Sequence, residues 1–206
     1  MYDMGKQASK YKRLEAPKGN KDYRNCSQLV SNIIYPHKEL KCPYCGQSMV
    51  IKSGTEIKTR FQDEQYFVCR NYPECDCYCR TLTVKGNKHI LVSTPADKKL
   101  RMMRAEAHHY LGAVINLGLY SYDLEHQTTH VYCMINDKTG LSIRSIAHIG
   151  ECREYGCRQV ANACVEILYK HKDKIKNYRP WEKGLLLDET HQIYISEIEK
   201  EICKNV

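Results

Sequence analysis

Four cysteines in the first half of the chain constrain its fold more than any other feature. They stand in the sequences Cys42-Pro-Tyr-Cys45-Gly46 and Cys69-Arg-Asn-Tyr-Pro-Glu-Cys75. A Cys-x-x-Cys turn lets two sulfurs reach one ion, and a second pair further along completes a tetrahedral site. We therefore expect one zinc ion held by Cys42, Cys45, Cys69 and Cys75.

Such a site is structural rather than catalytic. Four thiolates fill the coordination sphere of zinc, whereas a catalytic zinc needs an open position for water. Cys77 and Cys79 follow closely on Cys75, and Cys77 is the alternative fourth ligand. The spacing predicts one structural ion, with Cys75 as the expected fourth ligand and Cys77 as its substitute.

The rest of the composition favours an intracellular protein. The first residues contain no apolar run, and no stretch approaches the ~18 apolar residues that suggest a transmembrane helix. We therefore expect no secretory signal, no membrane span and a cytoplasmic location. In that compartment the 12 cysteines act as thiols and metal ligands rather than as disulfides.

The charge of the chain favours a polyanionic partner. The 206 residues carry a formal net charge of +8 at pH 7. The excess of Lys and Arg lies mainly in residues 1–40 and 148–180, which flank the cysteine motif in sequence. This excess fits nucleic acid, and it fits equally an ordinary solvated, lysine-rich surface.

The order of motifs predicts an α+β fold in four parts. Residues 1–40 form a basic N-terminal arm and docking segment, 41–93 the zinc ribbon, 94–180 a helical domain and 181–206 an acidic C-terminal tail. Short β-branched and aromatic runs predict hairpins around the metal, one of them turning at Gly86-Asn87. The expected architecture is a small β-rich zinc ribbon packed against a three- to four-helix unit.

Several helices follow the ribbon. The capping sequence Thr94-Pro95-Ala96-Asp97 begins a helix that Gly118 ends. After a loop over 119–127, a short helix is expected over 129–136 and a long one over about 153–171. The tail contributes an amphipathic stretch marked by Ile195, Ile198 and Ile202.

Further short sequences extend the cysteine motif along the chain. They are Tyr72-Pro-Glu-Cys-Asp76, Leu100-Arg101 with Arg104 and Ala107-His108, Ala147-His-Ile-Gly150, and Cys157-Arg-Gln-Val160. Together with the cysteines they resemble a zinc-finger-containing family of bacterial and phage proteins, over residues 41–168. The ribbon alone resembles the zinc ribbons at the tail of type IA topoisomerases, which read CPxCG and then CxxYPxC. The resemblance implies a zinc-ribbon protein of phage or mobile-element origin.

Basic and aromatic residues of the ribbon are candidate contacts for a nucleic acid or a protein partner. Aromatic rings stack on unpaired bases while Lys and Arg follow phosphates, and the topoisomerase ribbons that this segment resembles bind single-stranded DNA. The alternative is an ordinary ribbon surface in which Phe67 supports the small core. The candidates are Arg60, Phe67, Arg70, Tyr72, Arg80, Lys85 and Lys88.

A second group of residues has spacing suited to a metal. His126, His130 and Cys133 fall on one face of a helix, and His148 or Cys152 would complete a site. The alternative is a set of ordinary polar residues, because no second Cys-x-x-Cys accompanies them.

The sequence thus predicts a non-enzymatic zinc-ribbon protein, without catalytic residues, that binds nucleic acid or a nucleic-acid-handling protein complex. One alternative is a phage-encoded inhibitor of a host RNA-guided defence nuclease, of the anti-CRISPR type, that acts by protein–protein contact. The other is a metal-dependent nuclease, although the chain has no paired-carboxylate nuclease pattern and no phosphate-binding glycine loop.

Overall fold

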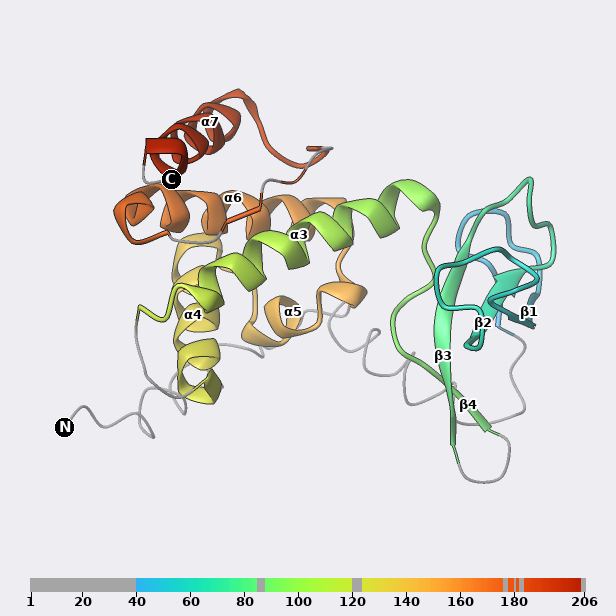
Figure 1. The fold of residues 1–206 in the computed structure, drawn as a ribbon. Helices are drawn as coiled ribbons and strands as arrows, with labels where there is room; N and C mark the ends of the chain where they lie inside the picture. The colour runs from blue at the N-terminus through green and yellow to red at the C-terminus, as the bar shows by residue number, and fades with distance from the viewer. Residues whose placement is uncertain are drawn as a thin grey trace. The chain divides into compact units, whose positions relative to one another are not determined.

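The computed structural model describes residues 40–84, 88–119, 124–175, 178–179, 181 and 184–204. The chain separates into two compact units, one ending at Arg101 and the other beginning at Met102. Each unit is described here by itself (Figure 1). The first is β-rich and the second is helical, which confirms the predicted α+β class. Apart from Leu40, the predicted N-terminal arm lies outside the described residues.

The β-rich unit is built on a four-stranded antiparallel sheet in the order β1-β2-β3-β4 (Figure 1). Each strand pairs with its neighbour in sequence, so the sheet is a series of hairpins. The hairpin predicted around Gly86-Asn87 is present as the β3–β4 pair, and its turn lies outside the described residues. The strands are Met49–Ser53 (β1), Gln65–Cys69 (β2), Tyr78–Val84 (β3) and Lys88–Leu91 (β4).

The two faces of this sheet carry different cores, because successive side chains of a strand point to opposite faces. On one face Met49 pairs with Cys69 beside the metal ligands. On the other, the rings of Tyr66 and Tyr78 meet edge to face with their centroids 5.7 Å apart. The metal-side cluster is Cys42, Met49, Cys69 and Cys77; the opposite cluster is Ile57, Tyr66 and Val68, packed against Tyr72 and Tyr78.

Among the described residues, the helical unit has four helices within the predicted range and one in the predicted tail (Figure 1). The first helix buries one face, with Met103, Ala107, Leu111 and Val114 all buried. No helix among the described residues is both long enough and apolar enough to cross a membrane. The helices are Lys98–Asn116 (α3), Leu124–Thr139 (α4), Ile143–Ala147 (α5), Glu154–Lys170 (α6) and Glu189–Lys204 (α7), with short 3-10 turns at Ile149–Glu151 and Lys172–Lys174.

Helix α3 begins later than the sequence predicts. The backbone of Ala96 exchanges two hydrogen bonds with Tyr78, at 3.1 and 3.2 Å, so the sheet holds the residues expected to start the helix. Asp97 is the cap instead of Thr94, because its Oδ1 accepts a hydrogen bond from the Leu100 N–H at 2.8 Å. At the other end, Gly118 adopts the left-handed φ of 62° typical of a helix terminus, as predicted.

Helix α4 begins earlier than predicted, so the loop expected over 119–127 is wrong for its last residues. Gln127 is buried, and its Nε2 donates to the carbonyl of Ile115 at 3.2 Å. That bond satisfies a polar group at the end of α3, a tertiary contact that the hydrophobic pattern of the sequence does not contain.

Helix α7 is fastened to α6 by paired polar and aromatic groups. Tyr169 stacks on Tyr194 with a centroid distance of 4.2 Å. The carboxylate of Glu197 accepts from the Tyr169 hydroxyl at 2.8 Å and from Lys172 Nζ at 3.1 Å. The tail predicted from its amphipathic stretch is therefore a docked helix.

Candidate metal centre

The first cysteine pair lies on a tight backbone turn that precedes β1. The Cys42 N–H donates to the Gln47 carbonyl at 2.7 Å, and the Gly46 N–H donates to the Cys42 carbonyl at 3.0 Å. Gly46 has a φ of 73°, a left-handed conformation that glycine adopts without the strain of a side chain. The hydroxyl of Tyr44 accepts from the Asp97 N–H at 3.2 Å, which ties this turn to the start of α3.

The second pair lies at the end of β2 and in the loop that follows. The Cys69 N–H donates to the Cys77 carbonyl at 2.9 Å, and the Cys75 N–H donates to the Asn71 carbonyl at 2.8 Å. Tyr72 fastens the loop from its other side, because its hydroxyl donates to the Ile57 carbonyl at 3.3 Å. The loop therefore presents Cys75 to the sulfur of Cys69 from a fixed position.

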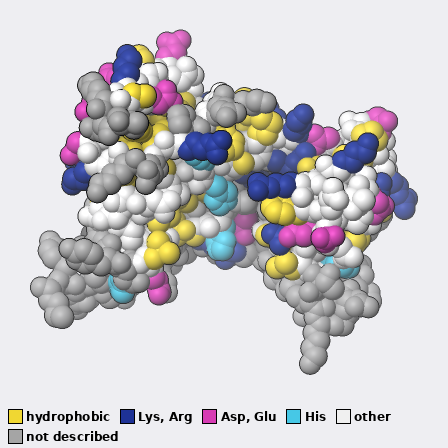
Figure 2. All heavy atoms as spheres, viewed as in Figure 1, with side chains coloured by type: hydrophobic (Ala, Val, Ile, Leu, Met, Phe, Trp, Pro, Cys, Tyr) yellow, Lys and Arg dark blue, Asp and Glu magenta, His cyan; other side chains and the backbone are white. Residues whose placement is uncertain are grey.

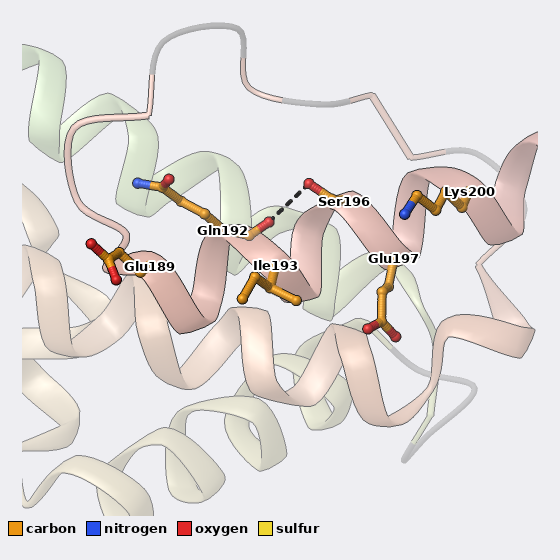
Figure 3. A pocket seen from close by; sticks show the side chains of 6 residues that line it. All are labelled: Glu189, Gln192, Ile193, Ser196, Glu197 and Lys200. Carbon is orange, nitrogen blue, oxygen red and sulfur yellow. Dashed lines mark hydrogen bonds between the residues drawn. The ribbon is translucent and has the colours of Figure 1, made fainter.

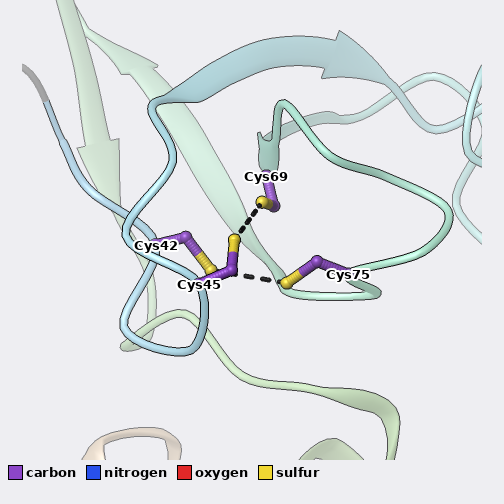
Figure 4. A group of neighbouring side chains, drawn as sticks. All are labelled: Cys42, Cys45, Cys69 and Cys75. Atoms are coloured by element: carbon purple, nitrogen blue, oxygen red, sulfur yellow. Dashed lines mark hydrogen bonds between the residues drawn. The ribbon is translucent and has the colours of Figure 1, made fainter.

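The four sulfurs converge on one point (Figure 4). Cys42 Sγ lies 3.6 Å from Cys75 Sγ, Cys45 Sγ lies 3.3 Å from Cys69 Sγ, and all four are within 4.8 Å of one another. Sulfurs bound tetrahedrally to zinc at ~2.3 Å lie about 3.8 Å apart. The spacing fits a zinc ion at the centre of the group, and the prediction of one zinc ion is confirmed.

The pKa values of the thiols differ within the group when no metal is bound. Burial raises the pKa of Cys42, but the N–H groups of Cys45 and Tyr44 oppose it and the net pKa falls to about 7. Burial and the neighbouring thiols raise the pKa of Cys69 to about 12 and also raise that of Cys75. Without metal the group therefore favours few thiolates, whereas a coordinated thiol is deprotonated outright. Binding of a divalent ion here therefore releases protons from these thiols.

Cys77 lies beside this group and not within it. It is fully buried in the core cluster with Cys42 and Cys69, but its sulfur is not among the four that converge. Burial, followed by the charges of Cys42 and Cys75, raises the pKa of Cys77. In this arrangement Cys77 fills the core under the metal, and Cys75 occupies the fourth position.

Arg101 supports the site, a role that the sequence did not reveal. Its guanidinium donates to the Asp76 carbonyl at 2.7 Å, to the Ala96 carbonyl at 2.6 Å and to Asp76 Oδ1 at 2.7 Å. It also lies 3.5 Å from the centroid of the Tyr78 ring. Because Asp76 stands between Cys75 and Cys77, this arginine fixes the segment that carries the fourth ligand.

The structure separates the predicted contact residues into two kinds. Arg60, Arg70 and Arg80 are exposed, and Arg80 Nε lies 2.5 Å from Glu64 Oε2. Phe67 and Tyr72 are only partly exposed: Phe67 packs on the metal-side cluster and meets the His89 ring at 6.2 Å, and Tyr72 supports the opposite cluster. Lys85 and the side chain of Lys88 lie outside the described part.

The proposed second metal site does not assemble. Among the described residues, the converging cysteines are the one group of three or more potential metal ligands, so His126, His130, Cys133 and His148 do not form another. The Cys152 thiol donates instead to the Ser145 carbonyl at 3.2 Å. Burial raises the pKa of Cys157 to about 12, so that thiol is an unreactive core group.

A hollow of about 450 Å³ lies along α7 (Figure 3). Of the two acids that border it, Glu197 is already held by Tyr169 and Lys172. The Ser196 hydroxyl donates to the Gln192 carbonyl at 3.1 Å. Glu197 and Ser196 thus stabilise the position and the backbone of α7.

The fold and the site together define a class: a four-cysteine zinc ribbon whose last strand leads into a helical unit. A family model described as a zinc-finger-containing domain, DUF3268, matches residues 38–167, and the chain belongs to this family. Searches of curated proteins and of solved structures returned no match. The likeness of the ribbon to type IA topoisomerases and the bacterial or phage origin stay predictions.

Proposed function

We propose that this zinc-binding protein is a non-enzymatic module that binds nucleic acid through the β-rich unit. The proposal rests on two arginines that are exposed and carry an unpaired charge. Arg60 and Arg70 are exposed, and no carboxylate of the described residues pairs with either guanidinium. Unpaired guanidinium groups on a rigid support are suited to bind phosphates.

The charge of the unit supports a polyanionic partner. Residues 40–84 and 88–101 contain ten Lys and Arg against six Asp and Glu. A zinc ion with four thiolates removes about two of these positive charges and leaves a modest excess. On the face drawn in Figure 2, Lys and Arg side chains alternate with acidic ones and form no continuous patch. Electrostatic attraction alone would therefore give weak binding, which points to an additional contact.

The position of Arg70 also links it to the metal. Arg70 directly follows the ligand Cys69, and its N–H donates to the Ser48 carbonyl at 2.9 Å. The zinc-bound segment therefore fixes the backbone from which this side chain extends. A structural zinc ion fits this role, because it stabilises a small module that displays side chains and supplies no reaction.

The test is the salt dependence of binding to a fluorescein-labelled single strand, followed by fluorescence anisotropy. Each lost phosphate contact lowers the slope of log K against log salt by about 0.7 for single strands. We expect Arg70→Ala to weaken binding and to reduce the slope by about that amount. Lys170→Ala is the matched control, because Lys170 is an exposed basic residue of the helical unit.

Two outcomes would contradict the proposal. One is wild-type protein that shows no salt-dependent binding to single strands or duplexes. The other is equal loss of binding in both variants, which would mean non-specific attraction to net charge. Stoichiometric binding to a purified RNA-guided nuclease, without affinity for free nucleic acid, would instead support the inhibitor of the anti-CRISPR type.

A further inference from the structure

The connection between β1 and β2 is an ordered loop, residues 54–64, that folds back on itself. The Gly54 N–H donates to the Glu64 carbonyl at 2.8 Å, the Thr55 N–H to the Gln62 carbonyl at 3.2 Å, and the Thr59 N–H to the Gly54 carbonyl at 2.9 Å. These bonds connect the two arms and the tip of the loop. Its conformation is therefore set by its own backbone.

Gly54 is the position at which the loop packs most tightly. A Cβ atom there would lie 2.0 Å from the Phe61 carbonyl oxygen and 2.7 Å from Thr59 Oγ1. No side chain fits in that space, so the backbone that carries Phe61 lies directly against Gly54. At the tip, Lys58 has a φ of 53°, a left-handed conformation that is uncommon for residues other than glycine.

The two apolar side chains of the loop differ in burial. Ile57 is 4% exposed and belongs to the core cluster with Tyr66 and Val68, whereas Phe61 is 53% exposed. Ile57 therefore anchors the loop, and Phe61 is displayed without being needed for that anchoring. The Arg60 guanidinium carbon lies 5.5 Å from the centroid of the Phe61 ring, so a cation accompanies the exposed aromatic face.

We propose that Phe61, with Arg60 beside it, is a stacking platform for an unpaired base of a single-stranded nucleic acid. An exposed ring on a fixed loop loses little conformational freedom when a base stacks on it. The neighbouring guanidinium can then bind the phosphate that belongs to that base. A duplex has no free base face to offer, so the platform selects single strands. This inference rests on the proposed function and names the contact that charge alone does not supply.

Phe61 differs from the aromatic residues that the sequence singled out. Phe67 and Tyr72 are held in the two cores of the sheet, whereas Phe61 lies on the surface next to a basic side chain. A protein partner is the competing occupant, but the paired guanidinium and ring match the alternation of phosphate and base in a nucleic acid.

The experiment compares two strands of equal length and charge, one with bases and one made of abasic sites, at a single salt concentration. Stacking contributes ~1–3 kcal/mol per base, which corresponds to a factor of about 5 to 150 in affinity. We expect wild-type protein to prefer the base-containing strand by a factor in that range. Phe61→Ala should lose this preference and bind both strands with the weaker affinity.

Two further variants separate stacking from simple contact area. Leu82→Ala removes an apolar side chain of the same unit that is 50% exposed but has no aromatic face, and it should keep the preference. Phe61→Trp should also keep it, with tryptophan fluorescence quenched by the base-containing strand only. The one native tryptophan, Trp181, provides the background signal measured in the wild-type protein.

The results separate the inference from the proposed function. If wild-type protein binds both strands equally and Phe61→Ala changes nothing, nucleic-acid binding stands and the stacking platform is refuted. If Leu82→Ala weakens binding as much as Phe61→Ala, apolar area rather than stacking is responsible, and the inference also fails. If wild-type protein binds neither strand, the proposed function itself fails. Binding to a protein partner, with no affinity for either strand, would overturn both the inference and the proposed function.

Discussion

Replacement of Arg101 by alanine is the perturbation whose effect the structure specifies most closely. The guanidinium donates to the carbonyls of Asp76 and Ala96, pairs with the Asp76 carboxylate, and lies on the Tyr78 ring. Arg101→Ala removes all of these contacts at once. The two backbone bonds between Ala96 and Tyr78 remain.

The expected loss of folding free energy is about 3 kcal/mol. Hydrogen bonds that involve a charged group contribute ~1.5–3 kcal/mol each when well shielded, and a cation–π contact adds ~0.5–1 kcal/mol. The side chains of Arg101 and Asp76 are 23% and 34% exposed, so water screens their ion pair and the total loss falls below the sum of these ranges.

This loss should appear in the affinity for zinc. In a small metal module the free energy of metal binding is largely free energy of folding. If the metal-free ribbon is unfolded, a loss of about 3 kcal/mol lowers the apparent zinc affinity by a factor of about 100. Competition with a chromophoric zinc chelator at neutral pH measures this directly.

Two matched variants make the result interpretable. Lys98→Ala removes an exposed cation from the same turn of α3 and should leave zinc affinity unchanged. Arg101→Lys keeps the charge but loses the planar fork, and it should lie between the wild type and Arg101→Ala. An affinity of Arg101→Ala within a factor of about 2 of the Lys98→Ala control would refute the reasoning, because the contacts would then contribute nothing to the metal-bound fold.

Three further outcomes are expected. Cys42→Ser should lose bound zinc and melt at a lower temperature, whereas Cys203→Ser, at an exposed thiol of α7, should retain one zinc by elemental analysis. Burial raises the pKa of Glu166 but Lys138 and its other partners lower it further, and the pKa of Glu197 is also lowered. The Glu197 carboxylate thus stabilises the docked α7 and the Glu166 carboxylate the contact of α6 with α4 above about pH 4. Both contributions are lost as pH falls, which hydrogen exchange of these helices should show. Asp63→Asn, two positions from the platform, should strengthen single-strand binding in the anisotropy assay.

The metal site was predictable because its information is local. The residue type and spacing of two short cysteine pairs indicate zinc, and the same motif contains the glycine of the turn at Gly46. The hairpins and the buried stripe of α3 were also predictable, since periodicity of apolar residues determines both. The start of α3 was not predictable. Ala96 pairs with Tyr78 of the sheet, a tertiary contact that the sequence around neither residue indicates.

The contact surface was less predictable, for a related reason. Sequence pattern alone does not separate Phe61 from Phe67, since both are aromatic residues near arginines. The two residues differ because the strand register places Phe67 on the metal side of the sheet, whereas Phe61 lies exposed on the loop. Arg101 shows the same limit: it is a basic residue in sequence and a structural support in three dimensions.

These observations connect the metal to the proposed platform through a short series of contacts. Zinc fixes Cys69 and Cys75, and the loop between them carries Tyr72. The Tyr72 hydroxyl holds the carbonyl of Ile57, and Ile57 anchors the loop that displays Phe61. The zinc ion therefore need not touch a partner to influence binding, because it supports one of the contacts that anchor this loop. It follows that zinc removal should weaken single-strand binding more than Phe61→Ala does, because it also releases the backbone that carries Arg70.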